Sequence, residues 1–356
     1  MFKVDSDGSA ITYHIPVNPF VPLQHTKIDV TTVNHLANFG VRFAMEHGWC
    51  YCRPRSNRAQ GASEAVDEGY VEPGGDVTVF FAGVEAQLTG EMPKFDGKIT
   101  PASLFFWGQF WVSHVGNSSF GIYGRLFHYD ATDEAKKVPI GVFKLTGVTV
   151  SKVSRKPVPI PKERAAMLLE TMQRHQLTVT LPRAVRIDLA GFLARSGVFT
   201  DETCCKTVNP LPTHASAAPL QVAYRREFHI RHSDIDFNGH VNQMALIQLV
   251  INAFRSALAD QTTIFPRLLD AGVNAIVGDL LLRRLHIDYV RETPMDHRSV
   301  IVTLFFIDDV SRDAVIASSA ESRGKTMADL GFLAQGVLTD GAPPHIAAIG
   351  VLCICC

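Results

Sequence analysis

Apolar and polar residues follow the same order twice along this chain. In each half, a short strand-like run leads into an apolar segment of helical length, and several runs rich in Val, Phe, Trp and Tyr follow. Alternation with a period of two predicts strands, whereas apolar residues three and four apart predict a helix. The pattern therefore predicts an α+β protein with two antiparallel sheets, each wrapping a long central helix.

In the first half, a strand over residues 11–18 precedes an amphipathic helix over residues 34–49. Leu36, Phe39 and Phe43 are spaced to share one face of this helix, and Gly48 is a plausible stop. The polar stretch that follows, residues 53–75, is typical of an insertion. Strand patterns and a trailing helix then follow at 76–90, 103–116, 119–130, 138–153 and 162–175.

Five aromatic residues mark the second of those strands, and we expect them to pack in the core. The alternative is that they line an apolar channel. They are Phe105, Phe106, Trp107, Phe110 and Trp111.

The second half has a strand over residues 222–230 and a helix over residues 240–259. This helix is apolar almost all round, so we expect its own sheet to enclose it. Strand patterns follow at 280–290, 299–309, 314–322 and 331–338. The predicted organisation is a first domain (1–175), a linker (176–219), a second domain (220–342) and a tail (343–356).

Short sequence matches support an internal repeat. His25–Asp29 precedes the first helix much as His232–Asp236 precedes the second. Later, Gly90–Pro93 and Arg291–Pro294 each follow a long strand. Each half thus has an acidic residue before its helix and another after its next strand.

Composition limits the classes of function. The 356 residues include 34 basic and 35 acidic residues, for a net charge of −1, which argues against a nucleic-acid-binding protein. No apolar run is long enough for a membrane span, and the first residues lack the features of a signal peptide. We expect a protein of the cytoplasm or of an organellar matrix.

The seven cysteines form no disulfide framework, and their odd number favours a reducing compartment. Cys50 and Cys52 could join Cys204 and Cys205 in a metal site, but histidine ligands and suitable spacing are missing, so no metal or cofactor is expected. The final cysteines are also candidates for a lipid anchor, although a terminal Cys fits the prenylation pattern poorly. They are Cys353, Cys355 and Cys356.

The most informative stretch precedes the second helix. Asp236, Asn238 and His240 provide a carboxylate, an amide and an imidazole within five residues, and Gly239 permits close approach of the backbone. At a helix N-terminus, such groups can polarise a carbonyl and position a water molecule. Taken singly, Asp236 or Asn238 could be a helix N-cap and His240 a structural histidine.

These residues carry a resemblance to a known family. Residues 234–242 read D-I-D-F-N-G-H-V-N, which is similar to the motif before the helix in hotdog-fold thioesterases. With the later Tyr289-Val290-Arg291-Glu292, the second half most resembles the acyl-ACP thioesterase family. Thr293 stands where that family has Cys, which leaves Glu292 as the more credible acid-base group.

The resemblance implies a double hotdog that hydrolyses fatty acyl thioesters. It assigns catalysis to Asp236, Asn238, His240 and Glu292. The residues expected to bind substrate are Gly239, Val241, Asn242, Thr293 and, in the first half, Asp29 and Glu91. Asn242 could instead be structural, and whether Asp236 or Glu292 takes the proton from water stays open.

The first half lacks a Gly-His-Val-Asn sequence at the matching position, so we expect a degenerate site there that shapes an acyl tunnel. The expected partners are an acyl carrier protein or a coenzyme A thioester, without nucleic acid, and a homodimer through sheet edges is left open. Two alternatives remain for the function. One is an enoyl-thioester hydratase or dehydratase of the same fold, and the other is a non-catalytic acyl-binding protein.

Overall fold

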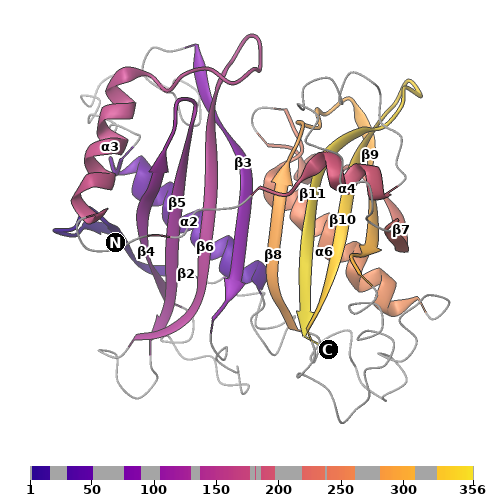
Figure 1. Ribbon diagram of the computed structural model, residues 1–356, viewed down its shortest axis with the longest axis horizontal. Helices are drawn as coiled ribbons and strands as arrows, with labels where there is room; N and C mark the ends of the chain where they lie inside the picture. Colours follow the sequence, from indigo (N-terminus) through magenta and orange to yellow (C-terminus); the bar gives the residue numbers. More distant parts are fainter. Residues whose placement is uncertain are drawn as a thin grey trace. The chain divides into compact units, whose positions relative to one another are not determined.

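The computed structural model describes residues 2–16, 30–50, 76–89, 105–129, 137–176, 181, 186–196, 219–236, 239–260, 281–308 and 327–355. The chain divides into two compact units, Met1–Val185 and Arg186–Cys356. Each unit contains an antiparallel sheet and a 17-residue helix (Figure 1). Each is described by itself below.

The first unit begins with a small hairpin of β1 (Phe2–Val4) and β2 (Ala10–Pro16). After α2 (Val30–Glu46), its sheet continues with β3 (Val77–Leu88), β4 (Phe105–Val115), β5 (Ser119–Tyr129) and β6 (Lys137–Ser151). The strand order is β1-β2-β4-β5-β6-β3, and α3 (Lys162–Gln176) follows β6. The predicted strands and the trailing helix of this half are confirmed to within a few residues.

Helix α2 packs against β2, β3, β4, β5 and β6, and it crosses one face of the sheet in Figure 1. The predicted apolar face is only partly right, because Leu36 is buried but Phe39 is 50% exposed. The small residues Ala37, Gly40 and Ala44 face the sheet instead and let the helix approach it closely. Gly48 ends the helix with a φ of +92°, as predicted.

Phe110 explains why a small residue is needed on α2. Its ring is fully buried, and a Cβ atom added to Gly40 would lie 2.8 Å from it. Gly108 on the same strand and Gly124 on the neighbouring β5 leave room for the same ring. The expectation that the aromatic residues of β4 pack in the core is confirmed for Phe106, Trp107, Phe110 and Trp111.

The second unit repeats this topology. Its elements are α4 (Leu189–Ser196), β7 (Gln221–His229), the 3-10 turn η2 (His232–Asp234), α6 (Gln243–Ala259), β8 (Leu281–Tyr289), β9 (His297–Phe306), β10 (Met327–Leu338) and β11 (His345–Cys355). The strand order β7-β9-β10-β11-β8 matches β2-β4-β5-β6-β3. In both units the strand before the long helix and the strand after it lie at opposite ends of this five-strand series.

Helix α6 begins at Gln243, three residues later than predicted, because residues 239–242 form a separate turn and cap. The helix packs against β7 and β9. Its buried side chains include Ile247, Val250 and Phe254, so the prediction of an enclosed apolar helix is confirmed for this face.

The segment 343–356, expected to be a tail, contains β11. This strand pairs with β10 on one side and with β8 on the other, so it lies inside the sheet. Its sequence, HIAAIGVLCIC, is almost continuously apolar because both of its faces are covered. The strand predicted over residues 314–322 lies outside the described residues.

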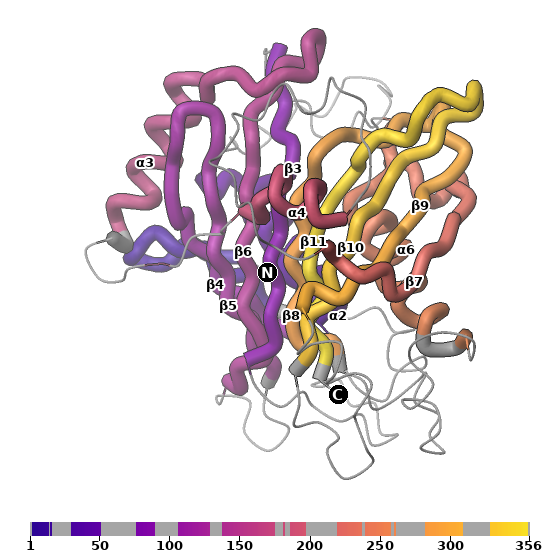
Figure 2. The backbone as a smooth tube through the Cα atoms, turned by 45° about the vertical axis from the view of Figure 1, so that its right-hand side comes forward, coloured from indigo at the N-terminus to yellow at the C-terminus, as the bar shows by residue number. Residues whose placement is uncertain are grey.

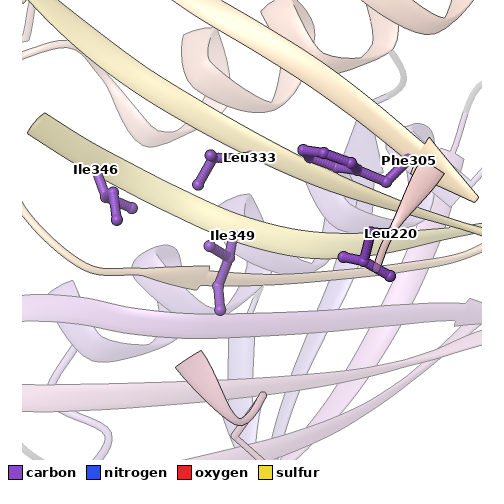
Figure 3. Close-up of a cluster of buried hydrophobic side chains, with 5 residues drawn as sticks. All are labelled: Leu220, Phe305, Leu333, Ile346 and Ile349. Atoms are coloured by element: carbon purple, nitrogen blue, oxygen red, sulfur yellow. The ribbon is translucent and has the colours of Figure 1, made fainter. Parts of the chain in front are cut away.

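Part of the segment expected to be a linker is packed structure. Helix α4 lies over the face of the second sheet opposite α6 (Figures 1 and 2). Ile187, Leu189, Phe192 and Leu193 pack on a cluster of five buried side chains of this unit. These are Leu220, Phe305, Leu333, Ile346 and Ile349 (Figure 3).

Asp288 on β8 anchors the start of this covering segment. It is 2% exposed, and its Oδ2 accepts a hydrogen bond from the backbone N–H of Ile187 at 2.6 Å. The guanidinium of Arg186 lies 3.2 Å from Oδ1. A buried carboxylate requires such partners, so Asp288 fixes where the segment meets the sheet.

Among the described residues, no helix combines the length and the apolar character of a membrane span. Cys50 and Cys353 are buried free thiols. Cys52, Cys204, Cys205 and Cys356 lie outside the described residues, as does the polar stretch 53–75.

Candidate active site

The site begins where β7 ends, at the turn η2. Asp234 is 3% exposed, and its carboxylate accepts hydrogen bonds from the backbone and the guanidinium of Arg231 at 2.9 to 3.2 Å. Its backbone carbonyl accepts from Asn242 N–H at 2.7 Å. Asp234 therefore ties the end of β7 to the start of α6.

Residues 236–240 form a tight turn. Asp236 N–H donates to His240 C=O at 2.8 Å, and Gly239 N–H donates to Asp236 C=O at 3.0 Å. The carboxylate of Asp236 accepts from His240 N–H at 3.3 Å. Gly239 has a φ of +76°, a left-handed conformation that Gly adopts without strain.

Asn242 is the N-cap of α6, because its Oδ1 accepts a hydrogen bond from Met244 N–H at 2.8 Å. This geometry supports a structural role for Asn242, which was the alternative to substrate binding. The sequence interpretation had considered Asp236 or Asn238 as the cap. Asp236 instead closes the turn around His240.

Glu292 reaches the turn from the segment that follows β8. Its Oε2 lies 3.5 Å from His240 Nε2, and both side chains are about one-fifth exposed. Two backbone hydrogen bonds join the segments: Val241 N–H to Thr293 C=O at 2.8 Å, and Met295 N–H to Gly239 C=O at 3.0 Å. The structure therefore brings together two predicted site residues that are far apart in sequence.

Two histidines lie beside the Glu292 segment. His297 Nδ1 is 3.1 Å from Pro294 C=O and 2.7 Å from a carboxylate oxygen of Asp296, and its Nε2 is 3.0 Å from His345 Nδ1. Burial and the neighbouring His297 lower the pKa of His345 to about 4. The sequence interpretation missed both histidines because they lie on separate strands.

Tyr289, at the end of β8, donates its hydroxyl to Gln243 C=O at 3.4 Å. Burial raises the pKa of Tyr289, so the hydroxyl keeps its proton and stays a donor. Thr293 is 3% exposed, and its hydroxyl has no hydrogen-bond partner among the described residues. Three other predicted site residues, Asn238, Asp29 and Glu91, lie outside the described residues.

This arrangement offers a proton acceptor next to an imidazole at the N-terminus of a helix. A carboxylate 3.5 Å from an imidazole can orient it and share a proton with it. The positive end of the α6 dipole faces the same region and favours negative charge there. These properties suit attack by water on a carbonyl carbon.

Comparison with solved structures shows the class of fold. The chain is similar to the 12:0-ACP thioesterase from Umbellularia californica, with a TM-score of 0.52, 11% identity, and coverage of 97% of this chain and 96% of the other. It is also similar to a Lactobacillus plantarum protein described as an oleoyl thioesterase, with a TM-score of 0.51, 12% identity, and coverage of 98% and 94%. The fold is hotdog-like.

One family model matches part of the second unit. Residues 217–270 match the family model of the acyl-ACP thioesterase C-terminal domain. This range includes Asp236, His240 and all of α6. The match covers this segment of the second unit, and the solved structures show the fold. No curated protein matches the chain.

Proposed function

We propose that the protein hydrolyses fatty acyl thioesters to a free fatty acid and a carrier thiol, using a site in its second unit. The observation that carries the proposal is the approach of Glu292, which lies beyond the family match, to His240, which lies within it. We assign catalysis to Asp236, Asn238, His240 and Glu292. Thr293 and the turn at Gly239 and Val241 contact the substrate.

The geometry favours Glu292 over Asp236 as the group that receives the proton from water. Asp236 uses a carboxylate oxygen to hold the turn, at 3.3 Å from His240 N–H, whereas Glu292 points its carboxylate at the imidazole. Water attacks the carbonyl carbon as Glu292 accepts its proton, and His240 orients the carboxylate. The tetrahedral intermediate then expels the thiolate by breaking the C–S bond, and the thiolate takes up the proton.

We further propose that the two units form a double hotdog, in which each sheet wraps its long helix. The matching strand orders of the two units support this proposal. In this double hotdog, the first unit has no working site of its own and shapes the acyl tunnel. The carrier is an acyl carrier protein or coenzyme A, and β7, at one end of the second sheet, is an edge through which a homodimer could form.

The test is release of free thiol from a panel of acyl-ACP and acyl-CoA substrates by wild type, Asp236→Asn, His240→Ala and Glu292→Gln. Loss of a general base lowers kcat by about 10²- to 10⁴-fold, and we expect the largest loss for Glu292→Gln. Glu170→Gln on α3 is the matched control, because Glu170 is exposed and pairs only with a neighbour on its own helix.

Three other outcomes would contradict parts of the proposal. Undiminished turnover in all three folded variants would remove the site. Acyl binding by wild type without turnover would favour the binding-protein alternative. Formation of a 3-hydroxyacyl thioester from an enoyl substrate would favour the hydratase alternative.

A further inference from the structure

The short segment after Glu292 sets where its carboxylate lies. Two backbone hydrogen bonds of 2.8 and 3.0 Å join residues 293–295 to the turn before α6, and they pair Pro294 with His240 as an isolated antiparallel β-bridge. The Glu292 carboxylate lies 3.5 Å from the His240 imidazole. A shift of residues 293–295 would therefore change that distance.

The imidazole of His297 supports this segment from its other end. Its Nδ1 lies 3.1 Å from Pro294 C=O and 2.7 Å from a carboxylate oxygen of Asp296. A carbonyl and a carboxylate only accept hydrogen bonds, so Nδ1 carries a proton and donates to them. His297, which is 7% exposed, thus ties Pro294 to the start of β9.

His345, at the start of β11, in turn fixes the ring of His297. Its Nδ1 lies 3.0 Å from His297 Nε2, and the two rings meet edge to face. A partner on the second ring nitrogen sets the tautomer and orientation of an imidazole. Burial and His297 lower the pKa of His345 to about 4, and the nearby backbone of Glu292 opposes this shift. Near neutral pH, His345 is therefore an uncharged partner for His297.

Strand β10 leaves room for the two rings at Gly336. A Cβ atom added to this glycine would lie 2.5 Å from Cε1 of His345 and 2.9 Å from Cδ2 of His297. Both distances are too short for van der Waals contact, so a larger residue at this position would displace the rings. The histidine pair is thus held by packing as well as by hydrogen bonds.

We propose that His345 is a positioning residue for the reaction. Through His297 it holds residues 293–295 against the turn that contains His240, and so it sets where the Glu292 carboxylate stands relative to that imidazole. This inference rests on the proposed hydrolysis. His345 itself touches neither the water nor the thioester.

The first test compares His345→Phe, which fills the space of the imidazole without its nitrogen atoms, with His345→Asn, which keeps a polar atom near the position of Nδ1. Misplacing a general base by about 1 Å lowers kcat by up to about 100-fold, and we expect such a loss for His345→Phe with little change in KM. His345→Asn should restore most of kcat. A role in packing alone predicts the opposite order, because Asn leaves a cavity and Phe does not.

The second test moves the rings without removing a polar group. Gly336→Ala should lower kcat in the same way as His345→Phe. The matched control is Gly331→Ala on the same strand, whose added Cβ would lie 3.0 Å from the ring of Phe192 and away from both histidines. This control should keep its kcat, and an equal loss in both glycine variants would count against the proposal.

Amide hydrogen exchange tests the support of the segment without turnover. In His345→Phe, the N–H groups of Val241 and Met295 should exchange about fivefold faster or more, the effect of losing about one hydrogen bond on local opening. The amides between β9 and β10 should keep their rates, and His345→Asn should resemble wild type.

Unchanged exchange of Val241 and Met295, or a kcat of His345→Phe close to that of wild type, would overturn the proposal. Absence of turnover by wild type would count against the proposed hydrolysis instead. In that case, the exchange rates would still decide whether His345 supports the segment.

Discussion

At the scale of single residues, the site combines groups that the sequence places far apart. Asp236 and His240 lie in one turn, and Glu292 arrives from the end of β8. The motif before the helix predicted Asp236 and His240, and the resemblance of Tyr289–Glu292 to a later family motif predicted Glu292.

His345 should make stability depend on pH. Its pKa is lowered to about 4 from an ordinary 6.5 by burial, by His297 and by Arg291, against smaller opposing effects of the Glu292 backbone and Asp296. Between these pH values the unfolded chain binds a proton that the folded protein does not. The free energy of unfolding should therefore fall as the pH is lowered from 6.5 to about 4.

The measurement is urea unfolding at several pH values across this window, with wild type compared with His345→Gln. The variant should lose part of the pH dependence. An equal pH dependence in both proteins would show that other groups cause it. His232→Gln is the control, because His232 is an exposed histidine of the same unit.

At the scale of elements, alternation and helical spacing predicted most strands and both long helices. The errors have physical causes. Helix α2 turns small residues rather than Phe39 toward its sheet. Small side chains let the helix backbone approach the sheet closely, whereas the size of Phe39 suggested that it would be buried. Helix α4 was missed because eight residues are too few for a clear periodic pattern, and its position depends on Asp288 and the cluster beneath it.

The close approach of α2 to β4 reverses the usual effect of replacing a helical glycine. Gly to Ala in an exposed helix gains up to about 1 kcal/mol. At Gly40 the added Cβ would lie 2.8 Å from the buried Phe110 ring. We expect Gly40→Ala to lower the free energy of unfolding by about 1–3 kcal/mol, as overpacking does.

A double-mutant cycle checks this prediction by urea unfolding. Phe110→Leu alone should destabilise the protein, but Gly40→Ala should cost less in the Phe110→Leu background than in wild type. Additive effects of the two substitutions would mean that the ring is not the cause.

At the scale of the whole molecule, the two units share one strand order although few of their residues match. The sequence indicated the repeat through short matches around the two helices. It did not indicate the inner position of β11, since a run that follows Pro343-Pro344 and contains several cysteines reads as a tail. Only the pairing of this run with both β10 and β8 shows its place.

Deletion of residues 345–356 should therefore abolish folding of the second unit. The deletion leaves β8 without its neighbour β11 and exposes the edge of β10. We expect aggregation or loss of the cooperative unfolding transition. Circular dichroism during a urea titration measures that transition. The variant Cys355→Ser keeps the strand and is the control. A folded, active deletion protein would contradict the assigned position of β11.

The position of β11 also sets an order of events during synthesis. Strands β9 and β10 can pair as soon as they emerge, because they are neighbours in both sequence and sheet. Strand β8 is made before them, yet its described partner in this unit, β11, is made after both. The carboxylate segment after β8, including Glu292, therefore gains its final support only after translation has passed residue 355. Until then, the unpaired edges of β8 and β10 are open to chaperones and to aggregation.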